Sequence, residues 1–117
     1  MNYTLYDMEN LIGIGNGRTY EDFQRHIPEV VKPLFDKLRT YCMSLDDKVV
    51  EDVRMHRVVF CKTMTFRWFA DLEPTEKSIM IKIQKERKIE PKISEITPDQ
   101  ELSEIESSLK DAFTTIR

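Results

Sequence analysis

Basic and aromatic side chains recur through the middle of the chain, and they are the residue types best suited to contact a ligand. Basic groups pair with phosphates and aromatic rings stack on bases, so their interleaving predicts a ligand or nucleic-acid surface. On an exposed sheet face the same residues can instead make cross-strand pairs and keep the surface solvated. The predicted surface residues are Arg67, Phe69, Lys82, Lys85, Arg87 and Lys88.

Metal-ligating residue types are present, but their spacing is not that of a metal site. His26 and His56 are the two histidines, and Cys42 and Cys61 are the two cysteines, without a C-x-x-C or H-x-x-x-H pattern. We therefore expect no metal and no cofactor. Both cysteines lie in apolar stretches, where a reduced thiol behaves as a small hydrophobic group, so we expect them to be buried.

An acidic cluster at residues 46–52 is the remaining candidate for a cation, because hard cations prefer carboxylate oxygens. The cluster is more typical of a solvated, capped turn between a helix and a strand. Its members are Asp46, Asp47, Glu51 and Asp52.

Nucleophilic catalysis would need a thiol or hydroxyl beside a base. Cys61 and His56 are the one such pair close in sequence, and residues five apart in a regular strand point to opposite faces. Gly13, Gly15 and Gly17 do not have the spacing of a G-x-G-x-x-G phosphate loop, so they predict a turn or an arm. We predict no catalytic residues, and an enzyme with an unrecognised site is the weakest alternative.

Length and composition predict a single domain. The chain has 117 residues, of which 40% are hydrophobic, enough for one core but not two. Its net charge of −3 neither favours nor excludes a nucleic-acid partner. No apolar run reaches 18 residues, and the opening MNYTLYDMEN has no basic side chain, so we expect no membrane span, no signal peptide and a cytoplasmic location.

Hydrophobic periodicity predicts two long helices. The first runs from about residue 28 to 44, with an apolar stripe of Val30, Val31, Leu34, Phe35, Leu38, Tyr41, Cys42 and Leu45, and with a soft start because of Pro33. The last begins at Pro98, after a capping box of Thr97 and Gln100. A short helix is expected over residues 19–25, with Thr19 as its cap and Phe23 facing inward.

Between the long helices the pattern changes to that of strands, at residues 48–54, 57–62, 64–71 and 78–84. A fifth edge strand is predicted within residues 85–96, where Pro91 confines it to an edge. Connections this short require an antiparallel meander. We therefore predict an α+β fold of two layers: an antiparallel sheet of four to five strands with an N-terminal and a C-terminal helix on one face, over residues 19–117, preceded by an arm or extension at residues 1–18.

Three stretches also carry a family resemblance: PEVVKPLFDKLRTYCMSL, RVVFCKTMTFRWFADLEPTEKSIMIKI and ELSEIESSLKDAFTTIR. Their order over about residues 27–117 resembles an uncharacterised prokaryotic family, domain of unknown function 5655, some of whose members are labelled predicted transport protein. The resemblance implies an α+β domain that occurs alone or attached to other proteins, often beside nuclease-like parts, and it implies no catalytic residues. Such domains usually have a glycine-rich turn before the last helix, whereas residues 85–96 here contain no glycine.

Taken together, these observations predict a small binding or interaction module. Its partner is an unknown protein or a second copy of the chain, met through the uncovered sheet face or an edge strand. The alternative is a nucleic-acid-binding accessory domain that uses the basic and aromatic residues named above.

Overall fold

Five strands and three helices make up the part of the chain that the computed structural model describes, residues 17–64 and 67–116. The sheet has the order β1-β2-β3-β4-β5, and every neighbouring pair is antiparallel. In chain order the elements are α2 (Tyr20–Gln24), α3 (Lys32–Ser44), β1 (Val50–Val53), β2 (Val58–Cys61), β3 (Trp68–Pro74), β4 (Ile79–Ile83), β5 (Lys92–Ile96) and α4 (Ser103–Thr115). The predicted α+β meander of up to five strands is confirmed.

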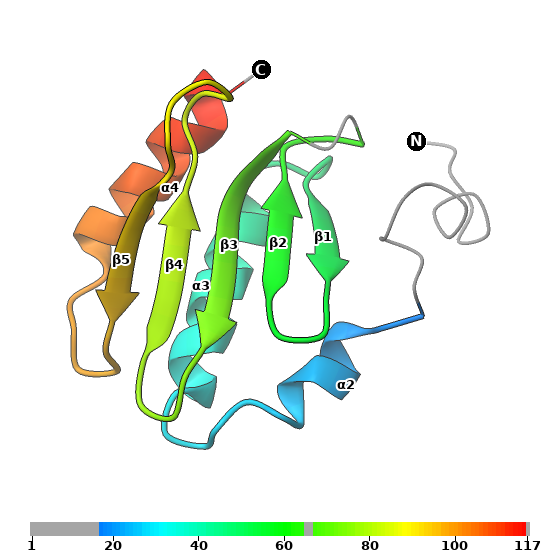
Figure 1. Ribbon diagram of the computed structural model, residues 1–117, viewed down its shortest axis with the longest axis vertical. Helices are drawn as coiled ribbons and strands as arrows, with labels where there is room; N and C mark the ends of the chain where they lie inside the picture. The colour runs from blue at the N-terminus through cyan, green and yellow to red at the C-terminus, as the bar shows by residue number, and fades with distance from the viewer. Residues whose placement is uncertain (1–16, 65–66, 117) are drawn as a thin grey trace.

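The two long helices lie side by side behind the sheet, on the same face (Figure 1). Each strand sends alternate side chains toward them, as β4 does with Ile79, Ile81 and Ile83. The largest fully buried side chains in this core are Phe35, Phe60, Phe69, Leu38, Leu72, Ile79, Ile81, Ile96, Leu109 and Ile116. One hydrophobic layer between sheet and helices therefore holds the domain together, and none of the helices within residues 17–64 and 67–116 lies over the opposite sheet face.

The start of α3 shows the effect of Pro33, which lacks the N–H that a helix interior requires. The helix begins at Lys32, so Pro33 occupies its first turn, where an N–H has no partner within the helix. Residues 28–31 form a turn instead. Val30, expected in the apolar stripe, is 58% exposed, whereas Val31 and the later members of the stripe lie in or against the core. The predicted helix was right and its first four residues were wrong.

The short helix α2 forms as predicted, with Phe23 buried and the Thr19 hydroxyl accepting a hydrogen bond from the Asp22 N–H at 3.2 Å. Its aromatic rings pack on α3: the Phe23 and Phe35 centroids are 5.6 Å apart, and Tyr20 stacks on Phe35 at 6.1 Å. The Tyr20 hydroxyl also donates a hydrogen bond to the carboxylate of Asp36. These contacts fix the entry of the chain against the helical layer.

Strand β3 lies further along the chain than predicted, at residues 68–74 rather than 64–71. Pro74, which lies beyond the end of the predicted strand, is the last residue of β3 and lies opposite Ile79. Along a strand, the backbone N–H and C=O groups of successive residues point to alternate neighbouring strands, and those of residue 74 point to the β2 side. The pairing of β2 with β3 already ends at Val58 and Leu72. The missing N–H of Pro74 therefore costs no ladder hydrogen bond.

A β-bulge interrupts the pairing of β2 with β3. Phe60 lies opposite Ala70 and Cys61 opposite Trp68, so Phe69 is an extra residue in β3. Phe69 and Ala70 both enter the core, and Trp68 faces the other way. The strict alternation expected for this stretch placed Phe69 on the exposed face and was wrong for that reason.

The last helix, α4, begins at Ser103 rather than at Pro98. The predicted capping pair forms, because the Thr97 N–H donates to Gln100 Oε1 at 3.2 Å, but it closes a turn ahead of the helix. Glu101 instead accepts a hydrogen bond from the Ser103 N–H at 2.8 Å at the helix start. At the other end the Lys62 ammonium donates to the Ile116 carbonyl at 2.9 Å, which ties the end of α4 to the end of β2.

Two further expectations concern the ends of the chain and the membrane. The predicted arm at residues 1–18 lies outside the described residues except for Gly17 and Arg18; Gly17 has a φ of +87°, a conformation that favours glycine. In the described ranges no helix combines the length and the apolar composition that crossing a bilayer requires.

Candidate functional site

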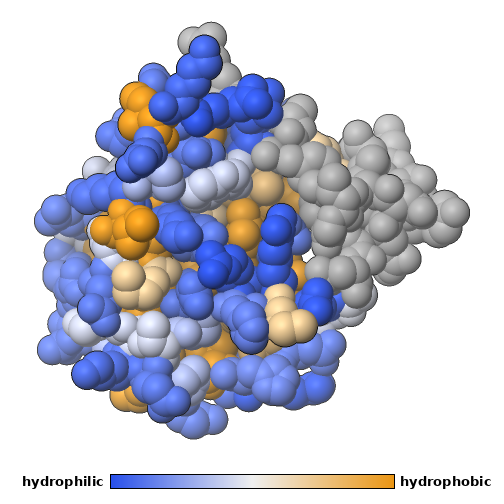
Figure 2. All heavy atoms as spheres, in the orientation of Figure 1, coloured by the Kyte–Doolittle hydropathy of each residue, from blue (hydrophilic) through white to orange (hydrophobic). Residues whose placement is uncertain are grey.

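The sheet face opposite α3 and α4, here called the open face, carries the side chains of the strands that point away from the main core. By the strand register its residues are Val50, Asp52, Val59, Cys61, Trp68, Asp71, Glu73, Met80, Lys82, Ile93 and Glu95. Hydrophilic side chains cover most of its coloured part in Figure 2, with separate apolar patches between them. The open face is therefore mixed in polarity rather than uniformly charged.

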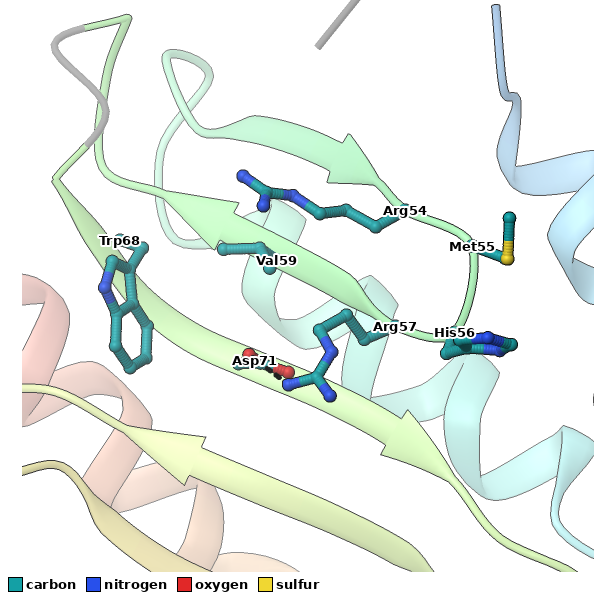
Figure 3. A pocket seen from close by; sticks show the side chains of 7 residues that line it. All are labelled: Arg54, Met55, His56, Arg57, Val59, Trp68 and Asp71. Carbon is teal, nitrogen blue, oxygen red and sulfur yellow. Dashed lines mark hydrogen bonds and ion pairs between the residues drawn. The ribbon is translucent and has the colours of Figure 1, made fainter. Parts of the chain in front are cut away.

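A hollow of about 500 Å³ lies in the open face beside the turn between β1 and β2. Its size is in the range of sites that take a small ligand or a few side chains. Figure 3 shows Trp68 and Asp71 along β3, and Arg57 reaching toward Asp71 from the start of β2. The lining residues are Arg54, Met55, His56, Arg57, Val59, Trp68 and Asp71.

The arginines of the hollow are held by carboxylates. Arg57 pairs with Asp71 at 3.2 Å and with Glu73 at 3.0 Å, both on β3. Arg54 pairs at 2.7 Å with Asp52, whose side chain is 2% exposed. Each guanidinium is therefore oriented by an ion pair within the chain.

Trp68 forms the apolar wall of the hollow. It packs against a small cluster of Val50, Val59 and Cys61, separate from the main core. Burial raises the pKa of the Cys61 thiol to about 12, and the nearby Asp52 carboxylate adds to the shift. Cys61 is therefore protonated at neutral pH and packs with Trp68 as a buried apolar group.

A second hollow, of about 410 Å³, adjoins the first and shares Met55 and His56 with it. His26, His56, Glu73 and Glu76 are among its lining residues. Met55 is 65% exposed between the two hollows. The turn between β1 and β2 is therefore an exposed ridge with a depression on each side.

The predicted surface residues divide into several groups. Phe69 is not on the open face: it is fully buried, and its ring meets that of Phe113 edge to face at 5.4 Å. Lys82 is on the open face, half-buried, and lies directly opposite Asp71 in the β3–β4 register. Arg67 is half-buried just ahead of β3, where its carbonyl accepts from the Lys62 N–H at 2.9 Å.

The other three basic residues, Lys85, Arg87 and Lys88, lie in the loop between β4 and β5 and are exposed. The Lys85 ammonium pairs with Asp111 of α4 at 2.6 Å. Because β2–β3 and β4–β5 connections leave an antiparallel sheet at the same end, this loop and Arg67 share one end of the molecule (Figure 1). The structure therefore places these residues at an end of the sheet rather than on its face.

The acidic cluster does not converge. Asp46 and Asp47 are exposed in the turn, where Asp46 accepts a hydrogen bond from the Lys48 N–H at 2.8 Å. Glu51 pairs with Arg39 of α3, and Asp52 points to the open face. Within residues 17–64 and 67–116, no group of three or more His, Cys, Asp or Glu side chains is arranged to hold a metal ion.

Sequence reasoning did not identify Arg54, Arg57 and Trp68, the residues that shape the hollow. Arg57 and Trp68 were assigned only to the predicted strands at residues 57–62 and 64–71. The signal that could have found them is the pairing of a basic residue at 57 with acids at 71 and 73, which an antiparallel register brings together.

The chain was compared with protein-family models, with curated proteins and with solved structures, and none of the three comparisons found a match.

Proposed function

We propose that this chain is a small binding module that takes a protein partner in the hollow of the open face. The observation that carries the proposal is the arrangement of ion-paired arginines around Trp68. Arginine, tryptophan and methionine are the residue types enriched where protein interfaces concentrate their binding energy. All three types line this hollow, and Met55 is exposed beside it.

The balance of charge supports a protein rather than a polyanion. The charged groups in and beside the hollow comprise three cations and three acids: Arg54, Arg57, Lys82, Asp52, Asp71 and Glu73. A phosphate backbone would meet carboxylates wherever it met cations, and phosphate contacts depend on unopposed positive charge. A peptide with apolar and polar side chains can match such a mixed surface.

The resemblance to domain of unknown function 5655 supports this proposal. The domains of that family occur alone or attached to other proteins, which is the behaviour expected of an accessory module that recognises a partner. On this proposal the paired arginines orient the partner, and the apolar wall of Trp68 and Val59 takes up one of its apolar side chains.

The proposal predicts that peptides selected for binding to the full chain from a display library depend on the hollow. We expect Arg57→Ala and Met55→Ala each to weaken the selected peptides at least tenfold, since central contacts of this kind cost more than about 1.4 kcal/mol when truncated. Fluorescence anisotropy of labelled peptides measures the change. Arg87→Ala, an exposed loop substitution, is the matched control and should bind as the unchanged chain does.

The Met55 side chain is largely exposed, so Met55→Ala should fold normally. Weaker peptide binding by this variant therefore cannot be attributed to unfolding. Selected peptides that bind the Arg57→Ala and Met55→Ala variants as tightly as the original chain would place the binding site elsewhere and refute the proposal.

A second candidate function, nucleic-acid binding, rests on the exposed loop between β4 and β5. Arg87 and Lys88 lie there, at the same end of the sheet as Arg67. If this loop contacts phosphates, we expect oligonucleotide affinity to fall steeply between low and physiological salt and to disappear in Arg87→Glu, Lys88→Glu. Anisotropy titration of labelled single- and double-stranded oligonucleotides measures it, and no binding at low salt would exclude this candidate.

A further inference from the structure

Strand β5 is an edge of the sheet, and the ladder determines which of its backbone groups face outward. The Gln84 N–H donates to the Phe69 carbonyl and the Thr75 N–H to the Ser78 carbonyl, so even-numbered residues of β4 bond to β3. The odd-numbered residues of β4 must then bond to β5, at the pairs Ile83–Lys92, Ile81–Ser94 and Ile79–Ile96. The N–H and C=O groups of Ile93 and Glu95 therefore point off the edge.

The segments at the two ends of β5 have opposite charge. Residues 84–92 contain four basic and two acidic side chains, a net +2, whereas residues 93–104 contain four acidic side chains and no basic one, a net −4. The first segment is the loop before the strand together with Lys92, its first residue, and the second contains the rest of the strand, the loop to α4 and the first two residues of that helix. An antiparallel neighbour of the same sequence would set each segment beside its opposite.

From this complementarity we infer that two copies of the chain pair through β5, antiparallel, about a two-fold axis at Ser94. In that register Ile93 of one copy lies opposite Glu95 of the other, and two-fold symmetry repeats this pair. Each of the two pairs exchanges two backbone hydrogen bonds, which makes four in all. Pro91, which has no N–H, lies just outside the paired residues and bounds the pairing. The two sheets become one continuous sheet, the usual outcome when an edge strand pairs with its own copy.

Side chains agree with this arrangement. Ile93 is 56% exposed on the open face of the edge strand, where a single chain leaves an apolar group in water. In the pair it lies beside the aliphatic stem of the partner's Glu95. Residues 84–91 of each copy then lie beside residues 97–104 of the other. Because the assembly has two-fold symmetry, this attraction between a basic and an acidic segment occurs twice in the dimer. The interface is separate from the hollow at the β1–β2 turn.

The inference predicts a dimer that weakens on dilution and in high salt. Light scattering after size exclusion, with sedimentation equilibrium of the full chain at about 50 and about 500 mM salt, measures its mass and dissociation constant. We expect Ile93→Pro to weaken the dimer at least tenfold, because it removes an outward N–H and no hydrogen bond to β4. Ile93→Val, which retains the N–H, is the matched control and should dimerise as the unchanged chain does.

A charge exchange tests the register independently of proline. Arg87→Glu, Lys88→Glu should dissociate the dimer, and adding Gln100→Lys, Glu101→Lys to the same chain should restore it, because the register sets residues 100 and 101 of one copy beside residues 88 and 87 of the other and opposite signs then face each other again. A chain that is monomeric throughout, or a dimer unaffected by Ile93→Pro or by the charge reversal, would overturn the inference. Peptide binding in the hollow is expected to be unchanged by Ile93→Pro, so failure of one proposal leaves the other standing.

Discussion

Replacing Phe35 by alanine is expected to lower the free energy of unfolding by about 3 to 5 kcal/mol, the usual cost of removing a buried aromatic side chain. Phe35 is completely buried, and its ring is the one that both Tyr20 and Phe23 pack against. The cavity would open between α2 and α3, where neither helix can move in without losing its other contacts. A domain of this size has roughly 5 to 15 kcal/mol of stability in total, so the loss is severe.

Urea unfolding followed by circular dichroism measures this change. Lys37→Ala, two residues away on the exposed side of α3, is the control and should stay within about 0.5 kcal/mol of the unchanged chain. A loss below about 1 kcal/mol for Phe35→Ala would show that the aromatic contact between α2 and α3 contributes little.

Alkaline pH is expected to destabilise the fold through its two buried thiols. Burial raises the pKa of Cys61 to about 12 and raises that of Cys42 as well, whereas an unfolded cysteine titrates near about 8.5. Above that value the unfolded chain loses protons that the folded chain keeps, so stability present below it is lost as pH rises toward the folded pKa. The two thiols together should remove roughly 3 to 4 kcal/mol between about pH 8 and pH 10.

Urea unfolding at a series of pH values, with reductant present, measures this slope. Cys61→Ala should remove about half of the pH dependence, since one of the two thiols is gone. The pKa of Tyr20 is also raised, chiefly by burial, so measurements should stop near about pH 10, where tyrosine begins to titrate in the unfolded chain. A free energy of unfolding that does not change up to that pH would mean that the thiols ionise within the fold.

Elements with a regular period were predictable from the sequence. Leu34, Phe35 and Leu38 follow the helical repeat and are buried, and Ile79 and Ile81 follow the strand repeat and are buried too. The errors fall where local rules compete with long-range pairing. At the capping box ahead of α4 the local hydrogen bond formed, but packing of the later turn decided where the helix began.

The candidate site was less predictable, because it depends on which residues face each other across the sheet. Arg57 and Asp71 are fourteen residues apart, and their ion pair exists only in the observed register of β2 and β3. Trp68 lines the hollow because the bulge turns it away from the core. A one-residue irregularity exchanges the two faces of a strand, and nothing in the composition of residues 64–71 indicates it.

The same bulge allows the chain to lose one residue without disturbing the pairing of β3 with β2, at the cost of the hydrogen bond that the Phe69 carbonyl accepts from the Gln84 N–H on the other side. If Phe69 were deleted, Trp68 would still lie opposite Cys61 and Ala70 opposite Phe60, now as neighbours in a regular ladder. Such a shortened domain would lose the ring beneath α4 and keep every side chain of the open face. Chains of this fold that differ by one residue here would keep the same open face, and aligning their sequences across this position would require a gap.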